Sequence, residues 1–332
     1  MIHIVGSGWY GCHLIEKLIH NKFDYICWEQ NESVLSGSSS KNQNRLHLGY
    51  HYPRNSITRK QSKEGFEMFL ESYPSLSREI SRNIYSIPND SFIDFDSYKA
   101  IYHHEQYLFT ELIDTHSLSN IEGAIEVSER LILHESASNF WNSKDFNINF
   151  NVKVSIVNGK LLSDSGKRIC KNSDIVIDCT YGDLLFDEDC FSEFFLTFLV
   201  RIDNFNFGAI TFMDGPFFSI FPLENSTKEN LYTLTHVSFC VLKSKNIDLK
   251  TIKEIFSHVL TDCSHYLGDY IKNIDLHSWY ISRKRKPISN SDSRSVNIKQ
   301  YDNIISVQSG KIDAVFHAEK LVSQALDNIL KK

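Results

Sequence analysis

Residues 2–11, Ile-His-Ile-Val-Gly-Ser-Gly-Trp-Tyr-Gly, combine a short apolar run with a Gly-x-Gly-x-x-Gly turn at Gly6, Gly8 and Gly11. A helical pattern of apolar residues follows at once, so a strand, a turn and a helix are expected in succession. Gly6 permits a tight turn, Gly8 lets backbone approach a pyrophosphate, and Gly11 lets helix and strand pack closely. The segment therefore predicts a dinucleotide-binding unit at the start of an α/β domain.

A second apolar run at 25–28 ends in Glu29. A carboxylate at this distance from the glycines is expected to accept hydrogen bonds from an adenosine ribose. The alternative is a glycine-rich turn in an ordinary α/β domain. The order of strand, turn, helix, second strand and terminal acid favours the dinucleotide site.

Composition narrows the possible classes of protein. The chain has 332 residues, 42% of them hydrophobic, which is enough for a large core and two domains. Its net charge is −6 and its one dense basic run, at 283–286, is short, so we expect no nucleic-acid partner. Seven scattered cysteines without a C-x-x-C pair predict reduced thiols and no metal site. No apolar run is long enough to span a bilayer and the first strand begins at Ile2, so we expect a cytoplasmic protein.

Residues 41–53, Lys-Asn-Gln-Asn-Arg-Leu-His-Leu-Gly-Tyr-His-Tyr-Pro, carry a specific resemblance. They resemble the second flavin-contacting segment of the D-amino-acid-oxidase-like FAD-dependent oxidoreductases, most closely the branch of L-2-hydroxyglutarate dehydrogenases and glycine oxidases. The segment departs from that pattern at Asn44, Arg45 and His51, where the relatives usually carry Gly, an apolar residue and Tyr. The resemblance implies cofactor contacts from Asn42, Arg45, His47 and Gly49.

Two later segments resemble further cofactor segments of the same family. The apolar run 175–179 ends in Thr180-Tyr181-Gly182, which is similar to a family turn beside the nucleotide, with Tyr181 in the usual glycine position. Residues 303–311 form another expected strand and end in Gly310-Lys311. A helix terminus and a lysine there would favour the electron-rich reduced flavin; the alternative is an ordinary C-terminal helix. Three separate segments fit FAD better than NAD, because flavoproteins of this class gather their cofactor from across the chain.

The resemblance implies a Rossmann-like FAD-binding domain joined to a mixed or antiparallel sheet that carries the substrate. We expect the FAD domain from residues 1–75, 148–190 and 296–332, and the substrate domain from 76–147 and 191–295. Within these parts, a helix is expected from Ile57 to about Ile84, at least as far as Pro74. We also expect a hairpin turn at 158–159, a strand-like piece at 98–103, and a helix at 105–114.

Imidazoles close to the expected flavin are the first candidates for catalysis. His47, followed by His51, is expected to accept a proton from substrate or to stabilise charge on the flavin, since an imidazole titrates near neutrality. The alternative for both is a structural histidine. Arg201 or Arg294 would supply a carboxylate clamp. Candidate substrate-binding residues are Tyr50, Arg54, Ser219, Tyr232 and His236, the last two on one face of a strand.

Together these features predict an FAD-dependent oxidoreductase that removes a hydride from a carbon bearing an amine or hydroxyl of a small polar substrate. Two alternatives share the fold: a flavoenzyme without net redox change, such as a sugar-nucleotide mutase, and a binding protein without catalytic activity. The sequence leaves the substrate, the electron acceptor, the flavin linkage and the oligomeric state open.

Overall fold

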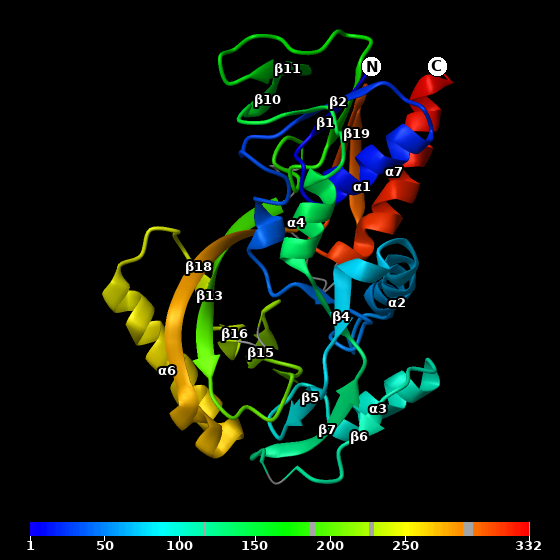
Figure 1. Ribbon diagram of the computed structural model, residues 1–332. Coiled ribbons are helices and arrows are strands. Elements are labelled where there is room, and N and C mark those ends of the chain that lie inside the picture. The colour runs from blue at the N-terminus through cyan, green and yellow to red at the C-terminus, as the bar shows by residue number, and fades with distance from the viewer. Residues whose placement is uncertain (116, 186–189, 226–228, 288–294, 332) are drawn as a thin grey trace.

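The computed structural model describes residues 1–115, 117–185, 190–225, 229–287 and 295–331. Two large sheets dominate it (Figure 1). The first carries both chain termini, and the second lies beside it with helix α6 (Leu249–Leu267) on its outer side. Among the described residues, no helix has the length and apolar character needed to cross a membrane.

The first sheet has the strand order β19-β20-β12-β1-β2-β9. Its strands are parallel except for β19. Their bounds are β1 Ile2–Val5, β2 Tyr25–Trp28, β9 Ile148–Asn149, β12 Ile175–Asp178, β19 Asn297–Tyr301 and β20 Ile304–Gln308. Segments far apart in the chain therefore become neighbours, and the carboxyl ends of the parallel strands meet at one edge.

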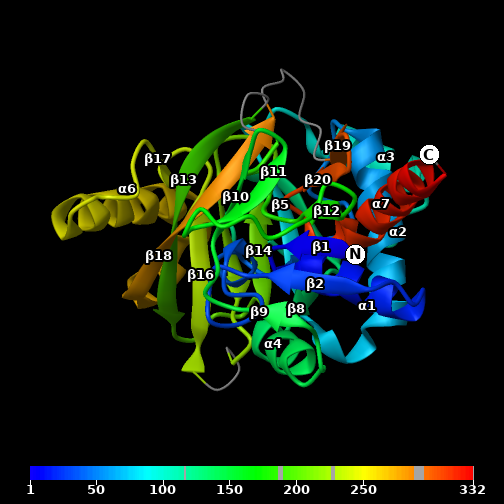
Figure 2. The same ribbon diagram turned by 90° about the horizontal axis from the view of Figure 1, so that it is seen from above.

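Alternating side chains of the first sheet are buried on both faces. Ile2 and Ile4 pack towards helices α1 (Trp9–His20) and α7 (Val315–Leu330), whereas Val5 packs towards the hairpin of β10 (Val154–Val157) and β11 (Lys160–Ser163). Helices on one face and a hairpin on the other give the layered arrangement seen in Figure 2. The result is a Rossmann-like domain, as the sequence predicted.

The second sheet has nine strands in the order β17-β13-β16-β15-β14-β5-β7-β6, with β18 also paired to β13. Apolar side chains from one face pack on α6 and form the largest core cluster. We call the opposite face, turned away from α6, the inner face. The strand bounds are β5 Asn83–Pro88, β6 Thr110–Glu111, β7 Ile121–Val127, β13 Cys190–Ile202, β14 Ala209–Phe212, β15 Phe218–Pro222, β16 Leu231–His236, β17 Val241–Leu242 and β18 Ile274–Pro287.

A small third sheet ties the expected flavin segment to the middle of the chain. Strands β3 (Arg45–Leu46) and β4 (Ser77–Glu79) both pair antiparallel with β8 (Arg130–Ile132). Helices α2 (Ser56–Ser72) and α4 (His134–Asn142) surround it, and Phe69 and Trp141 pack there with Trp9 of the first domain. Short 3-10 helices complete the described elements: η1 Ser38–Ser40, η2 Pro74–Leu76, η3 Gly268–Asn273 and η4 Ile312–Ala314.

The local secondary-structure predictions had mixed outcomes. The hairpin at Asn158-Gly159 is confirmed, and so is the helix up to Pro74. Its expected continuation towards Ile84 is wrong, because Pro74 ends the helix and strand β4 follows. The strand-like piece at 98–103 is wrong, because helix α3 runs over Phe95–His104. The helix at 105–114 is also wrong, because this stretch contains a turn and the short strand β6. Asp94 caps α3 by accepting a hydrogen bond from the Ser97 N–H. Tyr98 and Tyr102 lie one helical turn apart and are both buried, which is helical periodicity rather than strand alternation.

Candidate active site

The glycine turn lies between β1 and α1 as the motif predicts. Gly6 has a φ of +95°, and a Cβ on Gly11 would lie 1.9 Å from the carbonyl oxygen of Gly6, so the close approach there requires glycine. Helix α1 has no acidic residue in its first turn, and its N-cap is Gly8. The positive end of the helix is therefore left for an anionic group such as a pyrophosphate.

Glu29 ends β2 beside this turn and is buried. Its Oε2 accepts hydrogen bonds from the Ser7 N–H at 2.7 Å and the Ser7 hydroxyl at 2.9 Å. Its Oε1 accepts two from Asn31. The acid and the glycine turn thus form one unit, which fits the adenosine and pyrophosphate part of FAD.

Substitution of Gly11 by alanine is expected to destabilise the protein by about 1–3 kcal/mol and to reduce its FAD content, because the added methyl group overlaps backbone. Thermal unfolding and the ratio of flavin to protein absorbance measure both effects. Gly37→Ala is the matched control, since Gly37 has a φ of −81° and nothing lies within 4 Å of its added Cβ. Equal flavin content in both variants would contradict the assigned role of Gly11.

The two other predicted cofactor segments meet near the same edge of the first sheet. The buried Asp178 carboxylate ends β12 and accepts hydrogen bonds from the Thr180 N–H and hydroxyl and from the Ser306 hydroxyl. Tyr181 and Gly182 follow with φ of +66° and +81°. A Cβ on Gly310 would lie 2.5 Å from the Tyr181 hydroxyl oxygen, so the turn after β12 and the turn after β20 are in contact.

Two other predicted cofactor residues make internal contacts. Asn42 closes its own loop, accepting from the Asn44 N–H at 2.6 Å and donating to the carbonyls of Ser38 and Ser39. Asn44 has a φ of +52°, a conformation that asparagine tolerates better than most residues, which explains how it replaces the glycine of the relatives. The buried Lys311 ammonium lies 3.0 Å from Asp313 and 4.3 Å from the Tyr52 ring centroid.

A buried carboxylate that the sequence analysis did not identify organises the His-x-Gly segment. Strand β8 pairs with β3 in a register that brings Glu129 beside His47. Glu129 Oε1 accepts hydrogen bonds from the N–H groups of Leu48 at 2.8 Å and Gly49 at 3.2 Å, and Oε2 accepts one from Tyr85 at 2.7 Å. His47 Nδ1 lies 3.6 Å from Oε2.

These contacts decide the charge of Glu129. Complete burial by itself raises the pKa of the carboxyl, but the His47 imidazole and the hydrogen bonds from Tyr85 and Leu48 outweigh it and lower the pKa to about 2. Burial lowers the pKa of the neighbouring His51, and the nearby His47 and Arg45 lower it further. The site therefore holds an ionised carboxylate next to a partly exposed imidazole.

A row of hydroxyl groups crosses the inner face of the second sheet. The registers place Tyr85 of β5 beside Thr211 of β14, Thr211 beside Ser219 of β15, and Ser219 beside Thr235 of β16. Tyr85 donates to Glu129, so this hydroxyl row ends at the His47 site. Gln43 of the expected flavin segment contacts this row: its amide donates to the Thr233 hydroxyl at 3.0 Å and accepts from the Ser219 hydroxyl at 3.2 Å.

The structure corrects three of the predicted substrate residues. Tyr232 and His236 do share a face, but it is the face covered by α6: Tyr232 packs on Phe205, and His236 Nε2 lies 3.0 Å from Asp262 Oδ2. Tyr50 is fully buried among aromatic side chains and donates to the Leu108 carbonyl. All three therefore serve packing.

Of the other predicted site residues, some lie at the His47 site and the hydroxyl row and some do not. Ser219 is in the hydroxyl row, and His51 lies beside His47, with ring centroids 5.7 Å apart. Arg54 forms an ion pair with Asp214. Arg201 is exposed near the end of β13, and Arg294 lies outside the described residues. Arg45, expected at the cofactor, directs its guanidinium to Thr211 and Phe221 of the second sheet.

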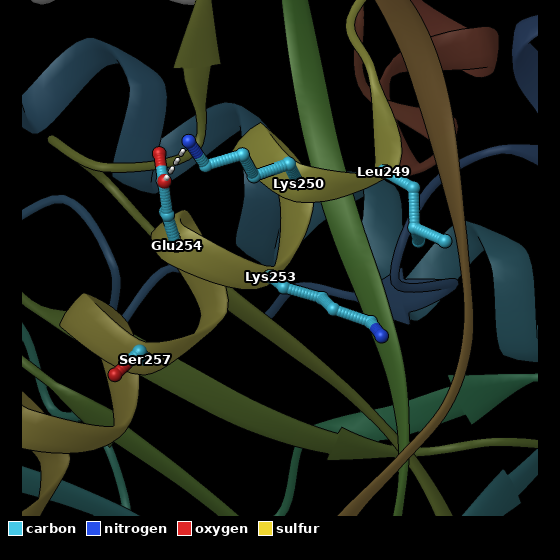
Figure 3. A pocket seen from close by; sticks show the side chains of 5 residues that line it. All are labelled: Leu249, Lys250, Lys253, Glu254 and Ser257. Carbon is cyan, nitrogen blue, oxygen red and sulfur yellow. Dashed lines mark ion pairs between the residues drawn. The ribbon is translucent and has the colours of Figure 1, made fainter.

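A shallow surface depression on α6 is a weaker candidate for a binding site than the His47 site. Figure 3 shows its lining side chains, which all come from consecutive turns of that helix, with Lys250 and Glu254 paired to each other. They are Leu249, Lys250, Lys253, Glu254 and Ser257. Polar groups on one solvated helix surface do not converge on a ligand. At the His47 site they do, because His47, Tyr85 and Glu129 come together from the segments of β3, β5 and β8.

Comparisons with known proteins identify FAD-dependent enzymes that are similar to the chain. No protein-family model matches the chain. It is 32% identical over 341 residues to the FAD-dependent monooxygenase FPY4 of Fusarium mangiferae, covering 98% of this chain and 90% of that protein.

Solved structures with a similar fold cover nearly the whole chain. Glycine oxidase from Geobacillus kaustophilus superposes with a TM-score of 0.73 at 11% identity, covering 98% of this chain and 94% of the other. The L-alpha-glycerophosphate oxidase from Mycoplasma pneumoniae, solved with FAD bound, gives 0.70 at 14% identity, covering 100% and 94%. At such identities the likeness concerns the fold, which holds FAD in the second of these proteins.

Proposed function

We propose that this chain, which belongs to the FAD-dependent oxidoreductases that include the monooxygenase FPY4, removes a hydride from a carbon bearing an amine or hydroxyl group of a small polar substrate. The observation that carries this proposal is the pairing of His47 with the buried, ionised Glu129 at the end of the hydroxyl row. This arrangement places a general base, His47, next to the carboxylate that positions it and to a row of hydroxyl groups that can bind a polar substrate.

Each group has a separate task in this scheme. Bound FAD supplies the two-electron chemistry by accepting the hydride. The His47 imidazole takes the proton from the substrate hydroxyl or amine, and Glu129 holds the ring in place and stabilises the imidazolium that forms. The hydroxyls of Thr211, Ser219 and Thr235 bind the polar groups of the substrate. The glycine turn and Glu29 anchor the adenosine end.

The decisive experiment is anaerobic reduction of the FAD-loaded protein by a panel of small amino acids, hydroxy acids and polyols. Loss of the flavin absorption near its visible maximum on addition of one class of compound is the expected result. The matching oxo product, identified by mass spectrometry, fixes the bond that was oxidised. A protein that retains FAD but is bleached by no member of the panel would argue against the proposal.

The curated relative favours a second candidate, monooxygenation, because its name states that activity. That reaction consumes O₂ and a reduced nicotinamide, with one oxygen atom entering the product and the other leaving as water. Substrate-dependent oxidation of NADPH or NADH in air, with ¹⁸O from ¹⁸O₂ in the product, would identify it. Substrate oxidation under argon with no nicotinamide present would favour hydride removal instead.

A further inference from the structure

The loop between β3 and α2, residues 47–55, carries three ring side chains of the candidate site. We call it the histidine loop. The centroid of the Tyr52 ring lies 5.9 Å from that of His47 and 5.3 Å from that of His51. The ammonium of the buried Lys311 lies 4.3 Å from the same Tyr52 centroid. Tyr52 is thus a neighbour of His47, His51 and Lys311, and a shift of its ring would affect all three.

A buried arginine bonds to the backbone of this loop. Arg59 lies in the first turn of α2, and its Nη1 donates to the carbonyl of Tyr52 at 2.8 Å and to that of Pro53 at 2.7 Å. Nε and Nη2 of the same guanidinium pair with Glu105, which follows α3. The Arg59 side chain is only 6% exposed. The ion pair fixes the guanidinium on one side, so that its charged Nη1 group can hold the two carbonyls on the other.

Two tyrosines of α3 contact the first part of the loop in the same way. The Tyr102 hydroxyl lies 3.2 Å from the carbonyl oxygen of Gly49 and 2.8 Å from that of Tyr50, and the Tyr98 hydroxyl donates to Tyr50 at 2.9 Å. Burial raises the pKa of both phenols, so they stay protonated and are able to donate. We call Arg59, Tyr98 and Tyr102 the carbonyl bracket, because each bonds to backbone carbonyls of the histidine loop.

The histidine loop consists of turns and irregular backbone, and ordering such a segment costs conformational entropy. The bracket bonds four of its carbonyls, those of residues 49, 50, 52 and 53, to buried donors on or beside two helices. Glu129 holds the N–H groups of Leu48 and Gly49 from the other side. A reacting group that is displaced by about one ångström can lose roughly a hundredfold in rate, so the order of this loop matters for chemistry at His47.

We propose that the carbonyl bracket positions His51 and Tyr52 for the reaction at His47, with Arg59 as the main positioning residue. This inference rests on the proposed function for the role of His47, whereas the order of the loop is a property of the protein without substrate. The effect of Arg59 passes through the Tyr52 carbonyl to the Tyr52 ring, and from that ring to His47 and Lys311.

The first measurement is hydrogen exchange of the FAD-loaded protein, read by mass spectrometry on peptides that cover the histidine loop. In Arg59→Met the loop amides should exchange roughly tenfold faster or more, because two charge-assisted hydrogen bonds are lost. Arg59→Lys should lie between this variant and wild type, since an ammonium keeps a donor but not the planar fork. Arg168→Met is the matched control and should leave loop exchange unchanged: Arg168 also donates to a backbone carbonyl, but it is exposed and lies beside the β10–β11 hairpin.

The second measurement is the limiting rate of flavin reduction per bound FAD, with a compound of the panel that bleaches the flavin. Arg59→Met should lower this rate roughly tenfold to a hundredfold, because His47 and Tyr52 lose their fixed arrangement. The concentration that gives half the limiting rate should change by less than about threefold, since the hydroxyl row proposed to bind substrate belongs to the second sheet. An arginine with a purely structural role would lower the thermal midpoint of unfolding and leave the limiting rate per flavin unchanged.

Several outcomes would overturn the proposal. Wild-type exchange of the histidine loop in Arg59→Met is one, and faster exchange with an unchanged limiting rate is another. If Arg59→Met does not fold, Tyr102→Phe replaces it, because it keeps the ring and removes the hydroxyl donor. This variant should raise loop exchange roughly threefold to tenfold and slow flavin reduction, and equality with wild type in both counts against the bracket. Faster loop exchange in a protein whose flavin no compound bleaches would keep the bracket and reject hydride removal.

Discussion

Exchange of His47 for glutamine is expected to slow substrate reduction of the bound flavin by roughly 10²–10⁴-fold, the usual contribution of a positioned general base. Glutamine preserves much of the volume and hydrogen-bonding capacity but does not take up a proton at neutral pH. The Glu129 carboxylate 3.6 Å away then loses the imidazolium that it is placed to stabilise. Rapid-mixing measurement of flavin bleaching under anaerobic conditions gives the rate directly.

Two measurements make the His47 result specific. FAD content and thermal unfolding of His47→Gln should stay close to wild type, because the imidazole is partly exposed and the loop is held through backbone N–H groups. His20→Gln, at an exposed position at the end of α1, is the matched control and should reduce flavin at the normal rate. A His47→Gln variant with unchanged reduction kinetics would leave histidine with a structural role.

Removal of the Glu129 side chain should have the largest effect on stability. Glu129→Ala leaves the N–H groups of Leu48 and Gly49 and the Tyr85 hydroxyl without their acceptor in a buried place. Each of the three unsatisfied groups costs about 1–3 kcal/mol, so a total loss of at least about 3 kcal/mol in unfolding free energy is expected. Urea unfolding measures it, and Glu71→Ala, at an exposed position of α2, should change stability by less than about 0.5 kcal/mol.

Glu129→Gln separates charge from hydrogen bonding. The folded-state pKa of Glu129 is lowered to about 2 from an ordinary value of 4.5, so the unfolded chain takes up the proton first as the solution is acidified. The stability from this group is complete above about pH 4.5 and is lost as the pH falls towards 2. The amide variant lacks this component, so its unfolding free energy should fall less steeply than that of wild type across this window. Parallel curves for the two proteins would contradict an ionised Glu129.

Prediction from sequence succeeded best where backbone geometry requires one residue type. At Gly11 a side chain would overlap the carbonyl of Gly6, and this restriction is visible in sequence because glycine alone satisfies it. Glu29 follows at the end of the next strand, which is a short-range relation. The hairpin at Asn158-Gly159 and the helix before Pro74 also depend on neighbouring residues, and both formed as predicted.

Prediction from local patterns failed for the substrate-binding residues of the second sheet. Alternation correctly paired Tyr232 with His236, yet the same alternation pairs Thr233 with Thr235 on the opposite face. Which face meets the flavin segment depends on α6, which lies later in the chain and covers Tyr232 and His236. A period of two identifies the two faces of a strand and does not say which partner each will meet.

Glu129 is the clearest residue that tertiary structure alone identified. In the sequence it is one acid before a short apolar run, and only the pairing of β3 with β8 brings it to His47. The sequence by itself predicted the dinucleotide-binding turn, which depends on local backbone geometry. It also predicted FAD as the cofactor, because short motifs in separate segments resemble those of FAD-dependent enzymes. Tertiary structure decided the partners of His47, the face that carries the hydroxyl row and the tyrosines that hold the histidine loop, because each depends on contacts between segments that are far apart along the chain.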